Sequence, residues 1–91
     1  MSIRVHVPQE LRRYCGGVAQ VEFEVQTVRA ALLELERAHP DVYRGVCDET
    51  GAVRRHINLF VNVLHIRDRD GLDTALAPGD ALIILPAVSG G

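Results

Sequence analysis

The chain has 91 residues, of which 47% are hydrophobic, and its formal net charge is -2. This composition is typical of a single folded domain and argues against a disordered or a nucleic-acid-binding protein. The longest apolar run, residues 81–88, is far shorter than the roughly 20 residues that cross a bilayer, and the N-terminus lacks a signal-peptide core. We therefore expect a cytoplasmic protein.

The chain's first third predicts two strands of a hairpin. Ile3-Arg4-Val5-His6-Val7 alternates apolar and polar residues, and Pro8 ends this strand. Residues 8–17 read as a loop closed by two glycines. A second alternating stretch follows over residues 20–25, and two neighbouring strands joined by such a loop favour an antiparallel pair.

A helix is predicted to follow the hairpin. Thr27 is a suitable N-cap, because its hydroxyl can accept from N–H groups of the first turn. The apolar side chains then recur at the spacing of one helix face, which suits a helix that covers a sheet: Val28, Ala31, Leu32 and Leu35. Pro40 should end this helix, and Asp41 could cap one further turn.

The second half predicts the remaining strands. Residues 57–63 alternate as a third strand, Ile66-Arg67 reads as a short fourth strand, and residues 72–76 as a helical turn. After the turn Pro78-Gly79-Asp80, residues 81–85 are apolar at every position, which predicts a central strand covered on both faces.

These elements predict an α+β fold with a mixed sheet of four to five strands and one main helix packed on one face. A right-handed crossover would place the last strand in the middle of the sheet, parallel to the first, which is the β-grasp arrangement. Residues 1–85 would form this domain. If the helix covers one face, the other would expose an apolar patch of Phe60, Ile83 and Leu85; the alternative is that both faces are core.

Side chains that could carry chemistry are scattered. The two cysteines, Cys15 and Cys47, lack the close spacing of zinc or redox motifs, and we expect both to be reduced. The four histidines form no metal-binding motif, so we expect no metal and no cofactor bound by this chain. No catalytic triad or nucleotide loop is visible, and we expect a protein that is not itself an enzyme.

All 10 basic residues are arginine. The absence of lysine excludes a usual P-loop, a Schiff-base lysine and a lysine general base. It also means that the chain could accept another protein's C-terminus only at its α-amino group. A codon bias toward arginine is an alternative explanation of this composition.

The chain ends in Pro86-Ala87-Val88-Ser89-Gly90-Gly91, directly after the last predicted strand. Glycine has no Cβ, so such an end can pass through a narrow channel. Together with Gly79-Asp80, the apolar strand, Thr27-Val28 and the run 57–62, this end resembles the MoaD/ThiS group of ubiquitin-like sulfur carriers over nearly the whole chain. The resemblance looks strongest to the cysteine-biosynthesis carrier of actinobacteria. Ser89 departs from the alanine of many members.

The resemblance implies that an E1-like enzyme, which supplies ATP and metal, adenylates the Gly91 carboxylate and converts it to a thiocarboxylate. A sulfur-accepting synthase, cysteine-synthase-like or a molybdopterin-synthase large subunit, would then take the sulfur. Residues 86–91 would be a flexible tail. Gly90 would give access, and the docking residues would be Phe60, Ile83, Leu85, Pro86, Val88 and Ser89.

Three alternatives stay open at this point. The chain could be the small subunit of molybdopterin synthase rather than a carrier for cysteine biosynthesis. It could be a protein modifier that forms isopeptide bonds through Gly91. It could also be a β-grasp interaction domain whose tail is inert.

Overall fold

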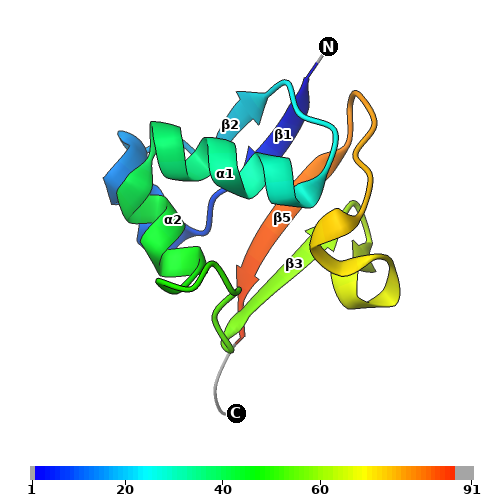
Figure 1. Ribbon diagram of the computed structural model, residues 1–91. Coiled ribbons are helices and arrows are strands. Elements are labelled where there is room, and N and C mark those ends of the chain that lie inside the picture. Colours follow the sequence, from blue (N-terminus) through cyan, green and yellow to red (C-terminus); the bar gives the residue numbers. More distant parts are fainter. Residues whose placement is uncertain (1, 88–91) are drawn as a thin grey trace.

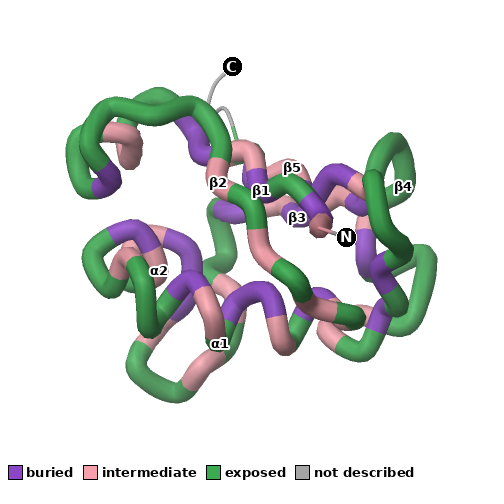
Figure 2. Tube along the Cα trace, turned by 90° about the horizontal axis from the view of Figure 1, so that it is seen from above, coloured by how far each residue is buried: buried purple, intermediate pink, exposed green. Residues whose placement is uncertain are grey.

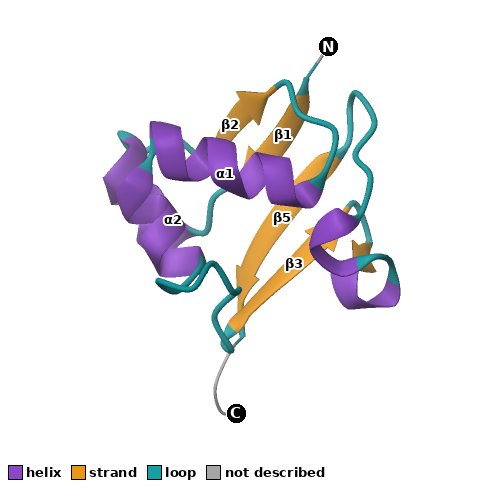
Figure 3. Cartoon of the chain, in the orientation of Figure 1, coloured by secondary structure: helices purple, strands orange, loops and turns teal. Residues whose placement is uncertain are grey.

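The computed structural model describes residues 2–87. One sheet carries the helices on one of its faces (Figures 1 and 3). The strands are β1 (Ile3–His6), β2 (Gln20–Phe23), β3 (Ile57–Val61), β4 (Leu64–His65) and β5 (Ala81–Pro86). The α-helices are α1 (Val28–Ala38) and α2 (Pro40–Val46), and the 3₁₀ helices are η1 (Gln9–Cys15), η2 (Ile66–Asp68) and η3 (Gly71–Asp73).

The strand order is β2-β1-β5-β3-β4. β5 runs parallel to β1 and antiparallel to β3, while β1–β2 and β3–β4 are antiparallel pairs. The predicted mixed sheet, with the last strand in its middle and parallel to the first, is thus confirmed. This arrangement places the end of β5 beside the start of β3, because Pro86 is the register partner of Ile57.

Helix α1 forms as its sequence predicts. The Thr27 hydroxyl accepts a hydrogen bond from the Ala30 N–H at 3.1 Å, which satisfies one of the free N–H groups at the helix start. The predicted apolar stripe is buried, and Val28 and Leu35 at its two ends are both 0% exposed. The same buried cluster contains Ile3 and Val5 of β1 and Leu82 and Ile84 of β5. This packing fixes which face of the sheet is covered.

A second helix replaces the predicted single turn after Pro40. Pro40 is the first residue of the seven-residue helix α2, and His39, not Asp41, is its N-cap. Proline is tolerated at this position because the first N–H groups of a helix have no partner within the helix. Burial of Val42 and Val46 at 0% exposure explains why α2 extends beyond one turn.

The predicted fourth strand at Ile66-Arg67 is wrong. Residues 66–68 form η2, and the fourth strand is the two residues before it, Leu64–His65. β3 ends at Val61, and Asn62 turns the chain with a φ of 56°, a left-handed conformation that asparagine adopts more readily than most residues. Ile66 then points into the core at 8% exposure, which ends the strand pairing.

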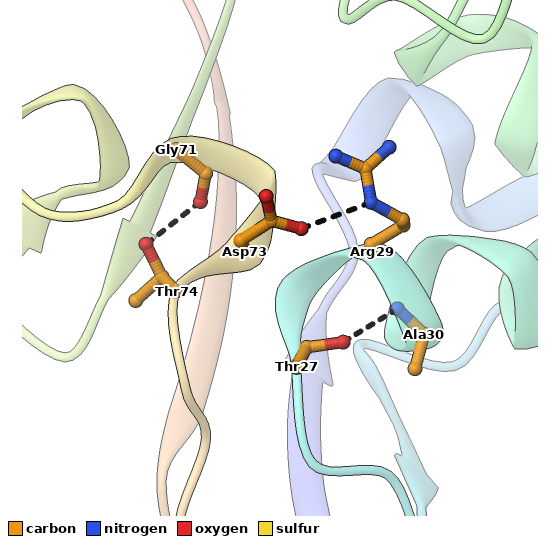
Figure 4. Close-up of polar contacts among 6 residues, drawn as sticks. All are labelled: Thr27, Arg29, Ala30, Gly71, Asp73 and Thr74. Atoms are coloured by element: carbon orange, nitrogen blue, oxygen red, sulfur yellow. Dashed lines mark hydrogen bonds and ion pairs between the residues drawn. The ribbon is translucent and has the colours of Figure 1, made fainter.

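The segment from residue 66 to residue 76 is fastened to the start of α1. Arg29 forms an ion pair with Asp73 at 3.1 Å, and the Val28 N–H donates to the Thr74 carbonyl at 3.1 Å. Thr74 is fully buried, and its hydroxyl donates to the Gly71 carbonyl at 2.7 Å (Figure 4). These contacts give the 3₁₀ segment a fixed position relative to β3.

Asp80 fastens the start of β5. Its carboxylate accepts from the Ala77 N–H at 2.9 Å and from the Asn62 side-chain amide at 3.1 Å. The Asn62 amide oxygen in turn accepts from the Ala81 N–H at 3.1 Å. The bond from the Ala77 N–H, followed by that from Asn62, holds the pKa of Asp80 below its usual range.

We predict that Asp80→Asn reduces the loss of stability in acid. A carboxyl whose pKa is lower in the folded state stabilises the fold above its unfolded pKa, and this contribution disappears as the pH falls through the folded pKa. Urea unfolding from about pH 5 to about pH 2 should therefore show a smaller decrease in unfolding free energy for the variant than for the unchanged protein. The exposed Glu49, changed to Gln, is the control; equal slopes for Asp80→Asn and the unchanged protein would contradict the assignment.

Candidate functional site

The face of the sheet opposite α1 and α2 carries a row of paired side chains. Both α-helices lie on the other side of the strands (Figure 2). The strand registers pair one residue from each of the five strands in a continuous line across the sheet. The row consists of Gln20, His6, Ile83, Phe60 and His65.

The three predicted patch residues lie together on this open face. Ile83 and Phe60 are direct cross-strand partners, and both are partly buried. Leu85 follows on the same face of β5 and is 47% exposed. The prediction that residues 81–85 are covered on both faces is therefore wrong: Leu82 and Ile84 are buried beneath the helices, whereas Leu85 faces solvent.

His65 completes the patch, and the sequence prediction missed it. Its ring meets Phe60 edge-on with the centroids 5.1 Å apart. Nδ1 accepts from the Arg67 N–H at 3.1 Å, so Nε2 carries the proton and donates to the Asn58 side-chain oxygen at 3.1 Å. Asn58 and Phe60 lie on the same face of β3, and Asn62 turns the chain. A strand that returns after this turn places His65 beside both side chains, so a hairpin turn at Asn62 was the signal that could have predicted this contact.

The root of the predicted tail lies at the end of this face. β5 continues one residue beyond the predicted strand and ends at Pro86, and the Ala87 N–H donates to the His56 carbonyl. His56 and the two residues before it, Arg54 and Arg55, are exposed. Val88, Ser89, Gly90 and Gly91 lie outside the described residues, and the division between domain and tail stays a prediction.

Neither a metal-binding cluster nor an exposed thiol is present in the described part of the chain. Between residues 2 and 87, no group of three or more His, Cys, Asp or Glu side chains could hold a metal ion. Cys15 and Cys47 are both free thiols and buried. Burial raises the pKa of the Cys47 thiol to about 11, which disfavours the reactive thiolate. No helix in the same range has the length and apolar character to span a membrane.

Comparisons with known proteins find similar sequences along nearly the whole chain. The model of the ThiS family matches residues 5–91. The sulfur carrier protein CysO of Mycobacterium tuberculosis is 36% identical over 93 residues, with all of both chains covered. A putative sulfur carrier protein of Archaeoglobus fulgidus is 28% identical, again with both chains covered in full.

Solved structures of similar proteins share the fold of this chain. The crystal structure of Mycobacterium tuberculosis CysO superposes with a TM-score of 0.85 at 34% identity, covering 94% of this chain and 99% of that one. A chain in the crystal structure of the Amycolatopsis orientalis BexX/CysO complex gives 0.87 at 35% identity, covering 98% and 99%. These similarities confirm the predicted β-grasp fold.

We predict that Cys47 resists alkylation in the folded protein. Cys47 is 1% exposed, and its pKa is about 11. Only an accessible thiolate reacts with iodoacetamide, so at pH 8 the reagent should modify Cys47 at least about 100-fold more slowly in the folded protein than in urea-unfolded protein. Peptide mapping by mass spectrometry measures both rates. Rapid modification of Cys47 in the folded protein would show that this thiol is available for sulfur chemistry.

Proposed function

Because this chain belongs to the ThiS/MoaD family of ubiquitin-like sulfur carriers, we propose that its Gly91 carboxylate is the covalent site of sulfur transfer. A carboxylate oxygen attacks the α-phosphorus of ATP, and pyrophosphate leaves. Hydrosulfide then attacks the acyl-adenylate carbonyl, AMP leaves, and a thiocarboxylate remains on Gly91. An E1-like partner supplies the ATP, the metal and the sulfur, and this chain supplies the carbonyl carbon.

The observation that carries this proposal is the path of β5. The strand is paired with β1 as far as Ile83 and with β3 as far as Pro86, and five residues of sequence then lead to Gly91. Five residues extend at most about 18 Å, so a partner bound to the domain can hold the terminal carboxylate within a defined range. In this proposal, the predicted flexible tail of residues 86–91 follows the domain of residues 1–85, and its first residue, Pro86, is still paired with β3. Gly90 passes the narrowest part of the partner's channel, and Pro86, Val88 and Ser89 contact the channel walls.

The open apolar face is the proposed docking surface for the activating enzyme and the client. Burial of a leucine side chain in an interface contributes about 1.5–3 kcal/mol, and Leu85 has nearly half of its surface available. Phe60 and Ile83 extend the same surface toward the centre of the sheet. His65, held by Asn58 and Arg67, presents a fixed polar edge beside them.

Similarity to CysO favours the cysteine-biosynthesis branch, and a cysteine-synthase-like enzyme as the client. The occurrence of a similar chain in the BexX/CysO complex supports a client or activating protein that binds the carrier directly. Activation requires ATP, which is consistent with a cytoplasmic location. The proposed role is that of a carrier without catalytic groups or a bound cofactor of its own.

Protein modification is the second candidate function. The small archaeal modifier protein 3 of Haloferax volcanii is 40% identical over 65 residues, 71% of this chain. A crystal structure of SAMP1 from Haloferax volcanii superposes with a TM-score of 0.82 over the full length of both chains. Conjugates of this chain with other proteins would distinguish this function from sulfur carriage. Because the chain has no lysine, one copy could be conjugated to another copy only at the α-amino group.

We predict that deletion of Gly91 abolishes activation without unfolding the domain. With a cognate activating enzyme, ATP-dependent exchange of labelled pyrophosphate should fall to background, because the carboxylate no longer reaches the nucleotide. Thermal unfolding should be unchanged. Ser89→Ala keeps the tail length and both glycines, and should retain exchange. Exchange by the deletion variant equal to that of the full chain would remove Gly91 from the mechanism.

We predict that Leu85→Asp weakens docking while leaving the chemical step intact. The KM for the carrier should rise at least about tenfold, the equivalent of about 1.4 kcal/mol, with little change in kcat. Leu33→Asp is the matched control, because Leu33 is 58% exposed on α1 at the opposite side of the molecule. Equal effects of the two variants would mean that the open face is not the docking surface.

A further inference from the structure

The outer edge of β3 is only partly paired. β4 contacts β3 through two register pairs, Phe60 with His65 and Val61 with Leu64. Residues 57–59 therefore have a neighbouring strand only on the β5 side. An unpaired strand edge is a template onto which another extended chain can add.

The hydrogen-bonding direction of the backbone shows which groups face outward. The His56 carbonyl bonds to Ala87, and the Asn62 N–H bonds to Ala81, so these positions face β5. Backbone groups alternate along an antiparallel strand, and hence Ile57 and Leu59 face the other edge. The Ile57 N–H donates to the Arg54 carbonyl at 2.9 Å. Within residues 2–87, the Ile57 carbonyl and the Leu59 N–H have no strand partner, and they offer one acceptor and one donor.

A groove runs along this edge. Residues 53–55 line one part, and residues 65–67 with Gly71 and Leu72 line the other. The second wall is held in place, because Ile66 is buried at 8% exposure and the segment that follows is bonded to α1 through Asp73 and Thr74. Val53 and Leu72 are partly buried and provide apolar surface. The groove is thus preformed rather than dependent on a moving loop.

The lining of the groove is positively charged although the whole chain carries -2. Arg54, Arg55 and Arg67 line it, and no Asp or Glu does. The Arg54 side chain donates to the Arg44 carbonyl at 2.7 Å. Arg55 and Arg67 are exposed and form no ion pair within the part of the chain that the structure describes. Charge complementarity therefore favours an acidic ligand.

We propose that the β3 edge binds an extended acidic segment of a partner protein as an added strand. The segment's backbone pairs with the Ile57 carbonyl and the Leu59 N–H, and its carboxylates pair with Arg55 and Arg67. Because Ile57 is the register partner of Pro86, the segment lies beside the root of the tail. A partner that takes up the tail can thus hold the domain by a second contact, separate from Phe60, Ile83 and Leu85.

A nuclear magnetic resonance titration tests this proposal. The probe is a synthetic ten-residue peptide of alternating glutamate and valine, added to the ¹⁵N-labelled full chain. We expect saturable shifts of the amide resonances of residues 57–59. Arg55→Glu and Arg67→Glu should each weaken binding at least about fivefold, because a charge-assisted bond is replaced by repulsion. Arg4→Glu, an exposed change of the same charge on β1, should have less than about a twofold effect.

Two further probes separate strand addition from simple charge attraction. The same peptide N-methylated at alternate residues cannot donate to the Ile57 carbonyl, and should bind more weakly than the unmodified peptide. A single-stranded oligonucleotide of equal charge should bind more weakly than the peptide.

The proposal is overturned if the peptide gives no saturable shift at residues 57–59, if the N-methylated peptide binds equally well, or if the oligonucleotide binds more tightly. An equal loss in Arg4→Glu would overturn it too. The titration requires neither ATP nor an activating enzyme, so its failure leaves the proposed sulfur carriage untouched.

Discussion

The burial of β5 between β1 and β3 is the constraint on which the rest of the molecule depends. Leu82 and Ile84 are fully buried beneath the helices, and they hold the last strand in the middle of the sheet. Alternation along a strand then requires Ile83 and Leu85 to face the other side. The same packing therefore stabilises the fold, creates the open apolar face and fixes the position of Pro86, the residue at which the proposed tail begins.

The two faces of β5 differ in the proposed function: one face stabilises the fold, and the other is the proposed docking surface. The covered face packs against α1, whose apolar stripe and N-cap were both predicted from the sequence. The open face carries partly buried and exposed apolar side chains whose removal from water is incomplete in the isolated chain. Such a surface is favourable to cover with a partner. The buried Cys47, with its raised pKa, belongs to the stabilising half and not to the chemistry.

The sequence predicted the elements whose signals are periodic. Helix α1, the first hairpin, the central position of β5 and the residues of the open patch all follow from apolar spacing. The fourth strand was misplaced by two residues because its register depends on the left-handed turn at Asn62, which periodicity does not encode. The expectation that residues 81–85 are covered on both faces was wrong because a wholly apolar run does not show which side chains the helices cover, whereas the predicted patch placed Leu85 on the open face.

The partly open edge of β3 could not be predicted either. It exists because β4 stops after two residues, when Ile66 turns into the core. The arginines that flank this edge are unremarkable in the sequence, since they lie in two separate segments. Only the folded arrangement brings Arg55 and Arg67 to one groove.

In the proposed function, the domain presents its terminal carboxylate to chemistry carried out by other proteins. The most direct measurement is the intact mass of the full chain after incubation with ATP, an activating enzyme and sulfide. We expect a gain equal to one replacement of oxygen by sulfur, located at Gly91 by fragmentation. An unchanged mass, with the activating enzyme shown to be competent on another carrier, would contradict it.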